Sequence, residues 1–194
     1  MTTFTAYPDT SHDHHRLPFL DRQVTPLPGE DSAHRWSRVV SAATRISLGW
    51  IFLWAFLDKL FGLGHETLSG KSWLDGTSPT LGFLKFGASG PFKGVAHSIA
   101  GQGWADWLFM GGLVTIGVAL MTGIAMRFAA AAGGLLLVLM WAAVLPPANN
   151  VFMDDHLIYA MVLVLLACLG AGRTLGLGKA WDALPIVRRH PSLR

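Results

Sequence analysis

Cysteine is nearly missing from this sequence, which contains only Cys168. A single thiol cannot form an intramolecular disulfide or a CxxC pair, and this argues against thiol–disulfide chemistry. The sequence also lacks a Gly-rich nucleotide loop, a Cys cluster for iron–sulfur or zinc, and a pair of histidines spaced for haem ligation. Any group that carries electrons is therefore expected to be diffusible or to belong to a partner.

Charge is also scarce, since 14% of the 194 residues are charged and 52% are hydrophobic. Soluble domains contain about 25% charged residues. No charged residue occurs in 108–126, 128–151 or 157–172. Runs of roughly 20 such residues are long enough to cross a hydrocarbon core of about 30 Å. The composition therefore predicts an all-α integral membrane protein whose main partner is the lipid bilayer.

Four membrane spans are expected, which would form a four-helix bundle. They cover residues 39–61, 104–126, 128–145 and about 154–172. The organisation that follows has three parts: a flexible cytoplasmic tail over 1–35, a membrane domain over 36–174 and an amphipathic, basic cytoplasmic tail over 175–194. The first tail contains the cluster His12, Asp13, His14 and His15, which we interpret as part of a solvated tail rather than a metal site.

The connection between the first two spans, residues 63–103, is long and rich in glycine. Pro79 and Pro91 stand at positions suited to the start of a helix. Short amphipathic helices are therefore predicted over 80–86 and 92–99, lying on the extracytoplasmic surface or folded back over the spans.

The distribution of Lys and Arg predicts the orientation, because cytoplasmic flanks are enriched in these residues. The two tails and the turn between the second and third spans hold ten of them, and the 63–103 connection holds Lys71, Lys85 and Lys93. Both termini are therefore predicted to be cytoplasmic. The basic residues form no patch of the kind that binds nucleic acid.

Asp154, Asp155 and His156 stand together at the start of the fourth span. Capping of the helix amino terminus explains one of the carboxylates. It does not explain a histidine that enters an apolar helix. Histidine beside carboxylates transfers protons near neutral pH, so all three are catalytic candidates. Two interpretations follow. In the first, these residues cap the helix and anchor it at the membrane interface; in the second, they transfer protons.

Charged residues also stand in the first span. Arg45, Phe52 and Lys59 share one stripe of the helix, and Trp54 shares the neighbouring stripe with Asp58. Charged groups within a span usually face other helices or a water cavity. One interpretation is an ion pair between Lys59 and Asp154 or Asp155. The other makes Arg45, Lys59 and Trp54 substrate-binding residues and Asp58 a catalytic one.

Two stretches resemble the DoxX/DoxD family of small bacterial and archaeal membrane proteins. The first is Arg45-Ile-Ser-Leu-Gly-Trp-Ile-Phe-Leu-Trp-Ala-Phe-Leu-Asp-Lys, and the second is Asn149-Asn-Val-Phe-Met-Asp-Asp-His with the exit Gly170-Ala-Gly-Arg. Between them, Ser78-Pro-Thr-Leu-Gly and Gly90-Pro-Phe are similar to the DoxD branch. The resemblance covers about residues 38–182. It implies a four-helix bundle in the plasma membrane of a bacterium or archaeon.

For DoxD, the resemblance implies the membrane subunit of a thiosulfate:quinone oxidoreductase, with quinone as a diffusible substrate. No stretch resembles the small second subunit of that enzyme, which would be a separate partner. The leading hypothesis is therefore a quinone-linked oxidoreductase subunit. The alternatives are a non-catalytic scaffold for a redox or stress-response partner, and a transporter that works as a homo-oligomer.

Overall fold

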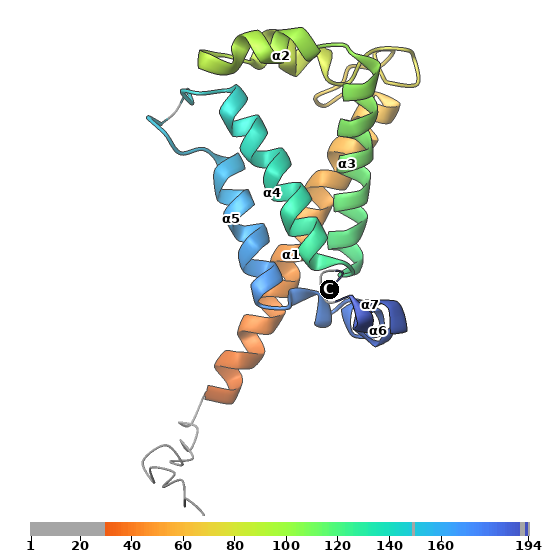
Figure 1. Ribbon diagram of the computed structural model, residues 1–194, viewed down its shortest axis with the longest axis vertical. Coiled ribbons are helices and arrows are strands. Elements are labelled where there is room, and N and C mark those ends of the chain that lie inside the picture. Colours follow the sequence, from red (N-terminus) through yellow and green to blue (C-terminus); the bar gives the residue numbers. More distant parts are fainter. Residues whose placement is uncertain (1–29, 149, 191–192, 194) are drawn as a thin grey trace, which may run out of the picture.

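The computed structural model describes residues 30–148, 150–190 and 193, and every element in this part of the chain is helical. Figure 1 shows their arrangement. The longer helices are α1 (Glu30–Phe61), α3 (Gly103–Thr122), α4 (Met126–Ala143) and α5 (Asp155–Cys168). The shorter ones are η1 (Phe83–Gly87), η2 (Gly90–Phe92), α2 (Lys93–Ile99), η3 (Ala171–Arg173), α6 (Gly178–Ala183) and α7 (Pro185–Arg189).

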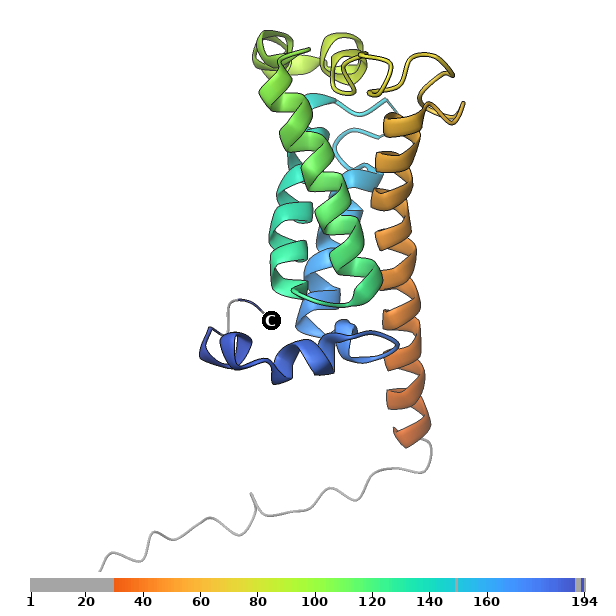
Figure 2. The same ribbon diagram turned by 90° about the vertical axis from the view of Figure 1, so that its right-hand side faces the viewer.

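Helix α1 begins earlier than the apolar run predicts. Its 32 residues span about 48 Å at 1.5 Å per residue. Residues 31–40 are all exposed, and Figure 2 shows this part of α1 extending beyond the other helices. The last six residues of the predicted tail, 30–35, are therefore helical. Residues 30–35 are mostly polar, so no apolar pattern in the sequence indicated a helix there. The cluster His12–His15 lies outside the described residues.

Three helices, α1, α3 and α4, are long and apolar enough to cross a membrane. Helix α5 is also apolar, but it has 14 residues and spans about 21 Å. It begins after the capping residue Asp154 and ends at Cys168, and Gly170 then turns the chain with a φ of 61°. A helix therefore lies where the fourth span was predicted, but it is shorter than the three helices that are long enough to cross a membrane.

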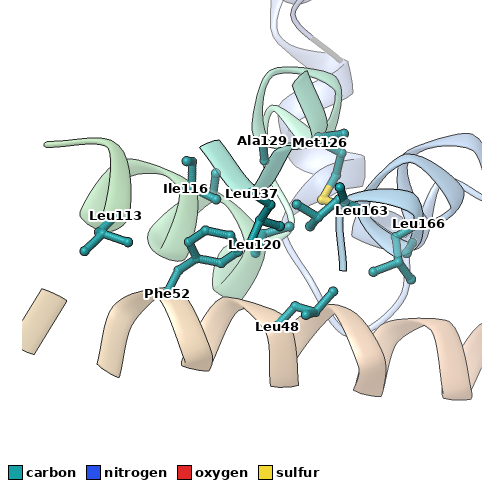
Figure 3. Close-up of a cluster of buried hydrophobic side chains, with 14 of the residues drawn as sticks. Leu48, Phe52, Leu113, Ile116, Leu120, Met126, Ala129, Leu137, Leu163 and Leu166 are labelled. Carbon is teal, nitrogen blue, oxygen red and sulfur yellow. The ribbon is translucent and has the colours of Figure 1, made fainter. Parts of the chain in front are cut away.

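The four longer helices enclose the main apolar core. Helix α1 packs mainly on α3, α4 packs mainly on α5, and α3 contacts α4. Figure 3 shows side chains from all four converging. The buried set includes Leu48, Phe52, Leu113, Ile116, Leu120, Met126, Ala129, Leu137, Leu163 and Leu166. Burying such side chains removes apolar area from contact with water or lipid and fixes how the helices pack.

Glycine allows α1 and α3 to approach closely. A Cβ on Gly117 would stand 2.9 Å from the backbone nitrogen of Leu53, and one on Gly49 would stand 2.9 Å from that of Met121. Gly111 and Gly112, by contrast, have no such neighbour within 4 Å. Gly117 on α3 and Gly49 on α1 therefore set the spacing of these two helices, whereas Gly111 and Gly112 leave open space.

The connection after α1 covers one end of these helices. Figure 1 shows α2 lying across the ends of α3 and α4. Helical turns are present near both predicted short helices, 80–86 and 92–99. Phe83 and Leu84 pack with Ala88, Ala96 and Ala143, whereas Phe86 is exposed. We call this end of the molecule the α2 end. The opposite end, where α6 and α7 lie, is the α6 end.

Candidate functional site

Two adjoining cavities lie at the α2 end. The first, which we call the polar cavity, has a volume of about 690 Å³ and lies among α1, α3, α4 and α5. Its polar lining residues are Asp58, Lys59, Glu66, Asp155, His156 and Tyr159. The second, the apolar slot, has a volume of about 430 Å³ and lies between α3 and α4, below η1. Both are lined by Lys59, Glu66, Phe83, Phe109, Leu136 and Met140, so the two share a wall.

His156 lies in the wall of the polar cavity, in the first turn of α5. Its Nδ1 is 2.8 Å from Oδ2 of Asp154 and 3.4 Å from Oδ1 of Asp155. A carboxylate at one ring nitrogen fixes the tautomer and leaves the other nitrogen for a ligand. Nε2 of His156 makes no hydrogen bond within the described residues. This geometry is suited to holding a proton and passing it to a molecule in the cavity.

The two neighbouring carboxylates have different roles. Asp154 is the N-cap of α5: its Oδ1 accepts a hydrogen bond from the amide of Leu157 at 3.1 Å. The predicted capping is therefore confirmed for this residue. Asp155 is 68% exposed, so its carboxylate contacts bulk solution or the interface. The same carboxylate of Asp154 both caps the helix and orients His156.

Asp154, Asp155 and His156 also offer donor atoms within 4.8 Å of one another. Such a spacing is compatible with a metal ion. The capping bond and the contact between Asp154 and His156 already account for the arrangement, and exposed acids often gather without an ion.

Lys59 belongs to the last turn of α1 and is partly buried between the two cavities. The described residues form no ion pair between Lys59 and Asp154 or Asp155, and both of those carboxylates lie against His156. Glu66, which follows in the next loop, lines the same two cavities. Lys59 therefore offers a positively charged donor to a ligand at the junction of the cavities.

Asp58 is 1% exposed, and its carboxylate holds the loop that follows α1. Oδ1 accepts from the amide of His65 at 3.3 Å, and Oδ2 accepts from the amide of Thr67 at 2.8 Å. Both oxygens are thus used by the backbone. This geometry gives Asp58 an anchoring role for the loop that contains Glu66.

Trp54 lines the polar cavity from α1. Its ring lies against the ring of His65, with centroids 5.2 Å apart in an edge arrangement, and 5.8 Å from Trp50. The structure therefore brings the candidates Trp54, Lys59, Asp155 and His156 to one cavity.

Arg45 lies far from this cavity, about 21 Å along α1 from Lys59 at 1.5 Å per residue. It is completely buried at the α6 end. Nη1 donates to the carbonyls of Leu120 and, at 3.2 Å, of Met121. Nη2 donates to the carbonyls of Thr174 at 3.3 Å and Leu175 at 2.8 Å. Arg45 therefore ties α1 to the end of α3 and to the chain after α5.

Asp106 is a site residue that the sequence did not indicate. It is 6% exposed and lies in the first turn of α3. Its Oδ1 accepts from the hydroxyls of Thr80 at 2.6 Å and Ser78 at 2.8 Å. These partners stand 26 and 28 residues away, so no local spacing reveals the contact. The bonds position the segment that covers the apolar slot.

Asp75, in the loop after α1, has its pKa held below its usual range by hydrogen bonds from the hydroxyl and the amide of Ser72. The loop therefore keeps a negative charge at neutral pH. Asp75 lines neither cavity and closes the turn in which Trp73 stands.

Comparison with family models gave no match, and neither did comparison with curated proteins or with solved structures.

Proposed function

We propose that this chain is the membrane subunit of a quinone-linked oxidoreductase. The observation that carries the proposal is the polar cavity, where Lys59 and His156 lie beside aromatic and aliphatic side chains. A quinone combines an apolar ring with two carbonyl oxygens that accept hydrogen bonds. Pockets for such molecules are mostly apolar with a few polar groups that fix the orientation.

In this proposal, α1, α3, α4 and α5 form a four-helix bundle in the plasma membrane of a bacterium or archaeon. Helix α5 is shorter than the hydrocarbon core, which local thinning of the bilayer and its flanking residues accommodate. The α6 end is cytoplasmic because Arg127, Arg173, Lys179, Arg188 and Arg189 gather near it. The polar cavity then opens toward the extracytoplasmic side.

The chemistry is reduction of quinone to quinol, which takes two electrons and two protons. Lys59 donates a hydrogen bond to one quinone oxygen and stabilises the negative charge that develops on it. His156, held by Asp154, passes a proton to the other oxygen, and a second proton from solution reaches the oxygen beside Lys59. Asp155, which is exposed, returns a proton from solution to His156.

The electron donor is proposed to be thiosulfate, on the basis of the resemblance to DoxD. Two thiosulfates join through a new S–S bond to give tetrathionate and release two electrons. Quinone accepts these with two protons and becomes quinol. A separate subunit would bind thiosulfate, since the described cavities offer Lys59 as their only Lys or Arg near an extracytoplasmic opening.

The test is extraction of quinone from the purified protein, together with an assay of thiosulfate-dependent quinone reduction with and without co-purifying partners. Bound quinone with turnover supports the proposal. Protein that retains no quinone and shows no turnover with its partners present would overturn it.

A second candidate function is a non-catalytic scaffold. Phe86, Phe92 and Val95 at the α2 end are 80%, 51% and 63% exposed, and such side chains suit contact with a partner. A stable partner after mild detergent extraction, with no quinone in the complex, would favour this function. Loss of that partner on replacing Phe86 by Ser would locate the contact.

A further inference from the structure

The apolar slot between α3 and α4 has an unusual lining. Among the residues that the structure describes, only Lys59 and Glu66 are charged and line the slot, and both stand on the wall shared with the polar cavity. The rest of the slot is lined mainly by aliphatic and aromatic side chains of α3 and α4. The charged groups of the slot are thus confined to its junction with the polar cavity.

The slot opens outward between the two helices. Trp104 and Leu108 line it from α3 and are 59% and 69% exposed. Leu135 and Leu139 line it from α4 and are 61% and 58% exposed. Each pair stands four residues apart and so forms one edge of the opening. Because α3 and α4 are apolar enough to span a membrane, this opening would face hydrocarbon.

The interior of the slot is empty where glycine replaces a side chain. A Cβ on Gly112, which lines the slot, would have no neighbouring side chain or facing backbone within 4 Å, in contrast to Gly117. The two helices meet more closely further down, where a Cβ on Gly133 would stand 3.2 Å from Ile116. The slot is therefore a gap that narrows toward the α6 end.

We infer that this slot takes the isoprenoid chain of a membrane quinone, which enters sideways from the bilayer while its ring occupies the polar cavity. The inference rests on the proposed function and extends it to the route and the chain. The slot volume of about 430 Å³ is on the scale of a pocket for a small ligand or part of one hydrocarbon chain.

Charge favours a neutral head group over a phospholipid. Lys59 stands with Glu66 and Asp155 around the polar cavity, so carboxylates outnumber the ammonium group among these three. An anionic phosphate would be repelled by this set. A quinone ring carries no charge and accepts hydrogen bonds, which Lys59 and His156 can donate.

The slot is expected to orient the quinone rather than to supply most of its affinity. A chain that moves from lipid into the slot exchanges one apolar environment for another and gains little. Blocking the slot should therefore weaken the binding of a quinone with a long isoprenoid chain and leave the binding of a chain-free quinone unchanged.

Gly112→Leu fills the slot, and Gly111→Leu is the matched control. Both positions lie in α3 with no neighbour within 4 Å of the new Cβ, but only Gly112 lines the slot. The probe is a quinone with a photoactivatable group on its isoprenoid chain, added to the purified protein in lipid nanodiscs. Cross-linked residues are identified by mass spectrometry.

The expected result is labelling around Leu108, Leu135 and Leu139 that falls at least tenfold in Gly112→Leu and persists in Gly111→Leu. Labelling elsewhere, or equal labelling in the two variants, would overturn the inference. So would slot labelling by a phospholipid probe that excess quinone fails to displace. Binding of a chain-free quinone, measured in the same samples, shows independently whether the proposed quinone site itself survives.

Discussion

Arg45 places a charged side chain within an apolar helix, and hydrogen bonds to backbone carbonyls stabilise it there. It contacts carbonyls rather than a carboxylate. The last carbonyls of a helix have no partner within the helix and carry partial negative charge. The backbone carbonyls of Leu120 and Met121 belong to this group, because both residues lie in the last turn of α3. The guanidinium therefore acts as a cap for α3 that is supplied by α1.

Replacing Arg45 by Met keeps an apolar stem and removes the donors. We expect the free energy of unfolding to fall by roughly 2–4 kcal/mol, because buried carbonyls left without partners cost about 1–3 kcal/mol each. Thermal unfolding of the detergent-solubilised protein, followed by circular dichroism, measures the change. Arg35→Met, on an exposed turn of α1, is the control and should change stability by less than about 0.5 kcal/mol. Equal stability of the two variants would contradict the capping role.

Asp154 and His156 allow capping to be separated from proton transfer. Ser is a good N-cap but is too short to replace the carboxylate on His156, so Asp154→Ser should keep α5 and weaken the orientation of the ring. We expect a fall in quinone reduction of about tenfold in Asp154→Ser and about a hundredfold in His156→Ala. Quinone reduction by membranes that contain the variants measures this.

Insertion and helix content serve as the control for both substitutions. Circular dichroism should give the same helix content as the unaltered protein. Full turnover in His156→Ala would exclude the proton-transfer role and leave interface anchoring as the explanation of this histidine.

At the scale of elements, the contact between α1 and α3 depends on the absence of a side chain at Gly117. We expect Gly117→Ala to lower the melting temperature, because the new Cβ would stand 2.9 Å from backbone of α1. Gly134→Ala, in α4, has no neighbour within 4 Å and should gain up to about 1 kcal/mol from helix propensity. The melting temperatures of Gly117→Ala and Gly134→Ala, measured in the same detergent, test this expectation. A higher melting temperature for Gly117→Ala would show that α1 and α3 are not packed this closely.

Helix positions follow largely from the sequence, and helix ends do not. Apolar runs predicted α3 and α4 within a few residues, and the paired prolines after Leu145 explain why α4 stops near there. The start of α1 at Glu30 could not be predicted, since residues 31–40 are exposed and carry no apolar pattern. Helix α5 ends just before Gly170, which has a left-handed conformation. Glycine adopts several backbone conformations, so the sequence alone does not predict this one.

At the scale of the whole molecule, the proposed orientation is open to a direct test. Cys168→Ser removes the only thiol, and single cysteines are then introduced as Ser69→Cys at the α2 end or Lys179→Cys at the α6 end. Both positions are exposed. A membrane-impermeant thiol reagent on intact cells should label the first variant and label the second only after permeabilisation. The reverse pattern would place the polar cavity on the cytoplasmic side.

The site was predictable in its residue types but not in its contacts. Asp154, Asp155 and His156 were indicated because they are adjacent in sequence. The place of Asp155 and His156 beside Lys59 in one cavity depends on how α5 packs relative to α1. The bonds from Ser78 and Thr80 to Asp106 join segments more than 25 residues apart, and no local pattern encodes them.

The hydrogen bonds of Arg45 also bear on how the protein is made. Its acceptors lie 75 residues further along the chain at Leu120 and 130 residues further at Leu175. During translation, Arg45 is therefore synthesised long before the residues whose carbonyls accept its hydrogen bonds. An unpaired arginine is costly in a membrane. Arg45 can make all of these bonds only after the chain has been synthesised through Leu175, so the final packing of α1 comes long after α1 itself has been made.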